Sequence, residues 1–107
     1  MRTLITGSRH YRLSDDDIAW MGMFSMSQVI FPSVGNNISI GARRMAGQRG
    51  LQTREVANPI GLPFQLDVKP MSDYCDRLIV FRNGGYDFWD IIHVAERQGV
   101  RVNVMGE

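Results

Sequence analysis

Four apolar residues in a row, Leu78 to Phe81, most restrict the fold that this chain can adopt. They lie between Arg77 and Arg82, and the turn-forming residues Asn83-Gly84-Gly85 follow them. A short apolar run without polar alternation is typical of a strand that is buried on both faces of a parallel sheet. Such a strand needs helices on both faces of its sheet.

Shorter runs rich in apolar or β-branched residues predict the other strands. They fall at Arg2–Thr6, Gln28–Phe31, Gln52–Val56 and Val100–Met105. Pro32 follows the second run and cannot donate to a central ladder, so that strand must end there. The first run ends at the turn Gly7-Ser8-Arg9.

Helical patterns separate these strands. The expected helices run from Ser14 to about Met26, from Ile38 to Gly50 and from Phe88 to Gln98, with a shorter one over 70–76 and a loop over 58–63. Ser14 precedes three aspartates, an N-cap followed by carboxylates that favour the positive end of a helix dipole. Gly50 and Gly99 stand where C-terminal cap glycines belong.

Strands that alternate with helices imply right-handed crossovers. We therefore predict the α/β class, a Rossmann-like three-layer sandwich with a mostly parallel sheet of about five strands. The 107 residues correspond to one domain, 1–107.

Composition removes several classes of function. Twelve Lys and Arg against eleven Asp and Glu give a net charge of +1, so a nucleic-acid partner is not expected. One cysteine, Cys75, and two histidines offer neither a disulfide nor a Cys/His metal site, which favours a reducing cytoplasm. The apolar stretch from Ile18 to Met26 is about half of the roughly 20 residues that span a bilayer, so no membrane partner is expected. We predict no cofactor and no metal.

The same apolar stretch covers almost the whole circumference of the first expected helix. A helix that rests on a sheet needs only one apolar stripe. We therefore expect a homo-oligomer that forms through residues 15–26.

Three loops are expected at the carboxyl edge of the sheet, where open parallel sheets bind ligands. The candidate ligand-binding residues are Gly7, Ser8, Arg9, Gly35, Asn36, Asn37, Ser39, Gly84, Gly85 and Tyr86. Glycines let backbone N–H groups approach a ligand, and the following helix presents unpaired N–H groups with partial positive charge. A phosphate, carboxylate or ribose is the natural ligand.

Each of these residues also has a purely structural interpretation. Glycine turns are needed wherever a strand meets a helix, and Ser39 is a candidate helix cap. Asp87, three residues before Asp90, suits an N-cap; alternatively its carboxylate accepts from ribose hydroxyls or acts on a glycosidic carbon as the catalytic residue. For Cys75, a buried and inert thiol is favoured over a nucleophile.

Three segments together resemble the SLOG superfamily of Rossmann-like nucleotide-binding domains, especially its compact YpsA-like branch, which is related to the LOG phosphoribohydrolases. The segments are 1–9 with its Gly-Ser-Arg turn, 35–51 with Gly35-Asn36-Asn37, and 71–102 with Gly84-Gly85. Where the family has Gly-Gly-x-Gly-Thr, this chain has Gly84-Gly85-Tyr86-Asp87-Phe88, a degenerate form of the loop.

The resemblance implies binding of a nucleotide-derived or nucleoside-like small molecule. It leaves open whether the chain is an enzyme. An enzyme would hydrolyse or transfer an N-glycosidic bond, as a nucleoside or nucleotide N-glycosidase or in a deoxyribosyltransferase-like way, with Asp87 directed at the sugar. The alternative is a non-catalytic nucleotide sensor, sequestering protein or inhibitor that acts through an apolar, partner-binding first helix.

Overall fold

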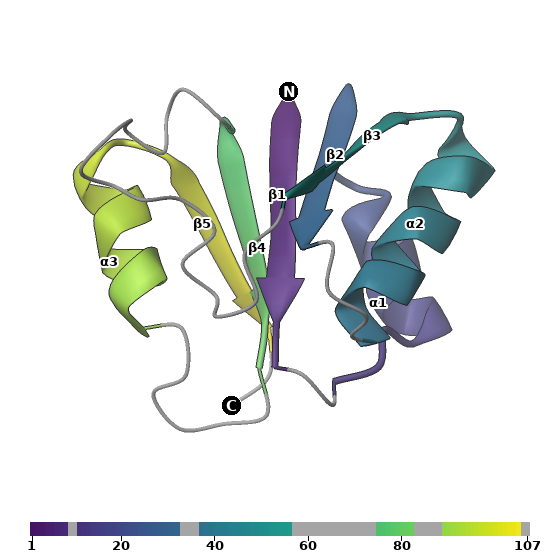
Figure 1. The fold of residues 1–107 in the computed structure, drawn as a ribbon, viewed down its shortest axis with the longest axis horizontal. Helices are drawn as coiled ribbons and strands as arrows, with labels where there is room; N and C mark the ends of the chain where they lie inside the picture. The colour runs from purple at the N-terminus through teal and green to yellow at the C-terminus, as the bar shows by residue number, and fades with distance from the viewer. Residues whose placement is uncertain (9–10, 33–36, 57–74, 83–88, 106–107) are drawn as a thin grey trace.

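The strands in the described part of the chain form one parallel sheet (Figure 1). A computed structural model gives the structure and describes residues 1–8, 11–32, 37–56, 75–82 and 89–105. The strands are β1 (Arg2–Gly7), β2 (Gln28–Pro32), β3 (Gln52–Val56), β4 (Arg77–Phe81) and β5 (Arg101–Met105). Their order is β3-β2-β1-β4-β5, and all neighbours are parallel. The predicted parallel sheet of five strands is confirmed.

Helices cover both faces of this sheet. They are α1 (Asp15–Met21), α2 (Asn37–Arg49) and α3 (Trp89–Arg97). In Figure 1, α1 and α2 lie on one side of the strands and α3 lies on the other. The three-layer α/β arrangement, consistent with a Rossmann-like fold, is therefore confirmed.

The core is divided by the sheet into two apolar clusters. Successive side chains of a strand point to opposite faces, so Leu4 joins the cluster under α3 while its neighbour Ile5 joins the cluster under α1 and α2. All five residues of β4 are buried. This is the expected result for the run of four apolar residues that the sequence places there.

Several local predictions are also confirmed. Ser14 caps α1 in a capping box, because its hydroxyl accepts from the N–H of Asp17 and its own N–H donates to the Asp17 carboxylate. Gly50 and Gly99 have φ angles of +66° and +76° after α2 and α3, in the left-handed region that favours glycine.

The predicted length of the first helix was wrong, because α1 ends at Met21 and not near Met26. After Gly22 the chain turns, with short-range bonds from the N–H of Met23 and Phe24 to the carbonyls of Trp20 and Met21. The Phe24 ring packs edge-on to Trp20, with centroids 5.0 Å apart, and also lies against the Arg77 guanidinium. Many of the apolar side chains of residues 15–26 therefore pack within the chain, although Met23 stays 79% exposed. The homo-oligomer through 15–26 stays a prediction.

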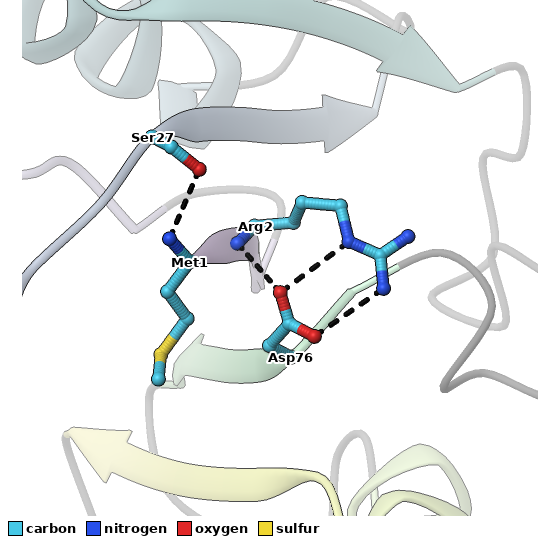
Figure 2. Close-up of polar contacts among 4 residues, drawn as sticks. All are labelled: Met1, Arg2, Ser27 and Asp76. Carbon is cyan, nitrogen blue, oxygen red and sulfur yellow. Dashed lines mark hydrogen bonds and ion pairs between the residues drawn. The ribbon is translucent and has the colours of Figure 1, made fainter.

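The amino-terminal edge of the sheet is joined by polar contacts between neighbouring strands (Figure 2). The backbone N–H of Arg2 donates to Asp76 Oδ2 at 2.8 Å, and its guanidinium donates to both carboxylate oxygens at 3.3 Å. The Met1 amino group donates to Ser27 Oγ at 2.9 Å. These bonds from Arg2 lower the pKa of Asp76. At this edge Arg2 and Asp76 therefore bond to each other rather than to a ligand.

Two other predictions, the loop at 58–63 and nearly all of the short helix at 70–76, fall outside the described residues. None of the helices that the structure describes is long and apolar enough to cross a membrane.

Candidate functional site

The strand order reverses between β1 and β4. The chain moves outward from β1 to β2 and β3, and then returns to place β4 on the other side of β1. In open parallel sheets, ligands bind in the crevice beyond the carboxyl ends of the strands at such a reversal. Here Gly7 ends β1 and Phe81 ends β4, and the two residues are paired in the sheet.

Gly7 allows three elements to meet at this point. A Cβ atom on Gly7 would overlap the Phe81 carbonyl oxygen. It would also lie 3.0 Å from both the Phe81 carbonyl carbon and Ile38 Cδ1. The next residue, Ser8, donates its N–H to the same carbonyl oxygen at 2.7 Å. The end of β1 is thus held against both the end of β4 and the start of α2.

The start of α2 contributes positive potential to this edge. Asn37 is the first residue of the helix, and no acidic side chain lies in the first turn. The first N–H groups of any α-helix lack partners within the helix and carry the positive end of its dipole. Ser39, in the same turn, is only 4% exposed.

Arg82 brings a cation to the same edge. Its backbone N–H donates to the Met105 carbonyl at 2.9 Å, which extends the ladder of β4 and β5 by one residue. By strand alternation Arg82 falls on the α3 face with Val80, whereas α2 begins on the opposite face. Its Nε and Nη1 atoms are buried and have no hydrogen-bond partner in the described part of the chain. A candidate ligand would therefore contact groups from both sides of the sheet's end.

An aromatic pair packs next to this region. The Tyr11 ring packs against the Phe81 ring with centroids 5.3 Å apart, and the Tyr11 hydroxyl donates to Asp17 Oδ2 at 3.2 Å. Burial, and then the Asp17 carboxylate, raise the pKa of Tyr11. The phenol therefore stays protonated at neutral pH and fixes the segment between β1 and α1.

Four of the predicted ligand-binding residues lie at this edge: Gly7, Ser8, Asn37 and Ser39. The other predicted site residues fall outside the described residues and stay predictions; they are Arg9, Gly35, Asn36, Gly84, Gly85, Tyr86 and the catalytic candidate Asp87. Cys75 is 1% exposed at the opposite edge, and burial raises its pKa to about 12, which agrees with an inert thiol.

Sequence reasoning missed Arg82 as a site residue, because it treated Arg82 as the polar end of a buried strand. The signal was available in the sequence, since a cation directly after a buried strand and before Asn83-Gly84-Gly85 must lie at the carboxyl edge.

Among the residues that the structure describes, no three His, Cys, Asp or Glu side chains are grouped to hold a metal ion. No family model matches the chain, and neither a curated protein nor a solved structure matches it. The resemblance to the SLOG superfamily therefore stays a prediction from the sequence.

Proposed function

We propose that this chain binds a nucleotide-derived or nucleoside-like small molecule at the carboxyl edge of its sheet, between the ends of β1 and β4. The observation that carries the proposal is Arg82, whose buried Nε and Nη1 lack a partner among the described residues at the strand reversal. A buried guanidinium nitrogen without an acceptor costs about 1–3 kcal/mol. An anionic oxygen of a ligand would supply that acceptor.

The neighbouring groups favour the phosphate of such a ligand. The first turn of α2 offers N–H groups and positive potential without a competing carboxylate. Gly7 lets the end of β1 lie against the Phe81 carbonyl and Ile38, which brings the end of β1 and the start of α2 close together. Arg82 adds a planar donor set that matches phosphate oxygens.

Chemistry on the ligand is a separate question from its binding. Asp17, the carboxylate that bonds to Tyr11, already accepts from the Ser14 N–H and the Tyr11 hydroxyl, which disfavours it as a nucleophile or base. Hydrolysis or transfer of an N-glycosidic bond would therefore depend on Asp87, which the sequence resemblance nominates. The second candidate function is a non-catalytic nucleotide sensor, sequestering protein or inhibitor. It is favoured by an edge whose described residues offer donors rather than free carboxylates.

Thermal shift with a panel of nucleosides, nucleotides and cyclic nucleotides tests the binding proposal. A ligand at about 100 times its dissociation constant stabilises by about 2.7 kcal/mol, which corresponds to about 10 °C in a domain of this size. Arg82→Gln should abolish the shift for phosphorylated members without lowering the melting temperature of the unliganded protein.

Arg97→Gln is the matched control, because Arg97 lies in the last turn of α3, near the start of β5 at the opposite edge of the sheet. A panel in which no member shifts the wild type, or a shift that survives Arg82→Gln, would refute the proposal. If a ligand is found, release of free base or sugar phosphate separates the enzyme from the sensor. Asp87→Asn should stop that release while leaving the thermal shift in place.

A further inference from the structure

The outer edge of β5 carries backbone groups that point away from the sheet. β5 is the last strand in the sheet order, next to β4. The Arg101 N–H donates to the Asp76 carbonyl and the Met105 carbonyl accepts from the Arg82 N–H, so both residues bond toward β4. Because alternate residues of a strand bond to the same side, Asn103 also bonds toward β4. The N–H and C=O groups of Val102 and Val104 must then point outward.

The two edge strands of the sheet differ in their protection against pairing. In β3, Gln52 to Glu55 are all exposed, and this stretch includes the charged residues Arg54 and Glu55. Charges of this kind are a usual protection of an edge strand. In β5 the one charged residue is Arg101, at the start, and Val104 is 37% exposed. Among the described strands, β5 is therefore the edge suited to accept a further strand.

The sequence of β5 is self-complementary about its centre. In an antiparallel pair related by a two-fold axis at Asn103, Val102 stands opposite the partner's Val104, and Arg101 stands opposite the partner's Met105. The outward groups of Val102 and Val104 then form the hydrogen-bonded pairs that an antiparallel ladder requires. No charge faces a like charge, and the valines meet on one face as apolar cross-strand pairs.

We propose that β5 pairs with β5 of a second copy of this chain, so that the two sheets form one continuous sheet across a two-fold axis. Four backbone hydrogen bonds join the copies, because each copy donates one from the N–H of Val102 and one from the N–H of Val104. This interface is distinct from residues 15–26, and it does not depend on the proposed ligand. Both ligand edges stay accessible, because the strands pair side by side and not end to end.

Val104→Pro tests this pairing directly. It removes the outward N–H of residue 104 but no bond to β4, and proline is tolerated at an edge position whose N–H faces outward. The wild-type chain should sediment as a dimer across a dilution series. The variant should have a dimer dissociation constant raised by about tenfold or more, because two of the four bonds are lost.

Val104→Lys is a second variant that should give the same loss without a constraint on the backbone, and Thr53→Lys on the β3 edge is its matched control. Circular dichroism melting shows that each variant folds. A wild type that stays monomeric throughout, or a dimer that survives both changes at Val104, would overturn the proposal. A dimer lost with Met23→Asp but not with Val104→Pro would also overturn it and would assign the interface to residues 15–26.

Discussion

Replacement of Gly7 by alanine should be among the most damaging single-methyl changes in this chain. The reason is close approach rather than backbone conformation, because the added Cβ would overlap the Phe81 carbonyl oxygen and lie 3.0 Å from Ile38 Cδ1. Carbon atoms in contact normally lie about 3.5–4.0 Å apart. The obstacle at Phe81 is backbone within a fully buried strand, so it cannot rotate away as a side chain would.

The magnitude follows from two contributions. Overpacking of a well-packed site costs about 1–3 kcal/mol. Separation of β1 from β4 also weakens the 2.7 Å bond from the Ser8 N–H to the Phe81 carbonyl, which is worth about 1 kcal/mol. The free energy of unfolding should therefore fall by about 2–4 kcal/mol. With an unfolding entropy of about 2.1 cal/mol/K per residue, the melting temperature should fall by about 10–20 °C.

Differential scanning calorimetry of Gly7→Ala beside Gly47→Ala gives the clearest measurement. Gly47 is an exposed glycine within α2, and a Cβ there would meet no atom within 4 Å. The same methyl group should raise stability by about 0.5–1 kcal/mol at Gly47, through helix propensity alone. A Gly7→Ala variant that melts within about 3 °C of the wild type would refute the close approach of β1 and β4.

Two further predictions concern the amino-terminal edge. Asp76→Ala should lower the free energy of unfolding by about 1 kcal/mol at neutral pH, a figure reduced for the solvent screening of a half-exposed pair. Because Arg2 lowers the pKa of Asp76 in the folded state, this contribution is present at pH values above the ordinary pKa of 3.8 and is lost as the pH falls through the lowered pKa. Urea titrations of the wild type and of Asp76→Ala at several pH values should therefore give unfolding free energies that converge in acid. Cys75, with a pKa of about 12 in a buried site, should react with a maleimide at neutral pH only as fast as the chain unfolds, and labelling that is complete within minutes in the native state would contradict this.

Much of the fold is predictable from this sequence because its elements carry consistent local signals. The apolar run in β4, the capping box at Ser14 and the cap glycines Gly50 and Gly99 each depend on short-range physics. The end of the first helix was wrong for the opposite reason. The apolar pattern continues to Met26, but after Gly22 the chain favours contacts with distant residues, because Arg49 donates to the Phe24 carbonyl and the Arg77 guanidinium lies over the Phe24 ring. That preference is tertiary and cannot be read from the spacing of apolar residues.

The candidate site was predictable only in its location. Glycine turns after strands indicate the carboxyl edge, and Gly7, Ser8 and the start of α2 do lie there together. The strand order decides which loops meet, and parallel crossovers of similar length permit more than one order. The burial of particular atoms, such as Arg82 Nε, depends on packing between elements that are distant in sequence.

The two arginines that flank β4 show why the carboxyl edge is the better candidate for binding. Arg77 is 9% exposed, and its Nε also lacks a partner among the described residues. However, its Nη1 donates to Asn103 Oδ1 at 2.7 Å, and its guanidinium lies 4.3 Å from the centre of the Phe24 ring. The guanidinium of Arg82 has two buried nitrogens without a hydrogen-bond partner. In the described part of the chain it has neither a bond like that of Arg77 to Asn103 nor a contact with an aromatic ring. Stability alone would favour an apolar residue at position 82, because an unsatisfied guanidinium destabilises the fold without a ligand. A substitution there that leaves the unliganded protein as stable as before, or more stable, while removing ligand binding would show that Arg82 serves the ligand and not the fold.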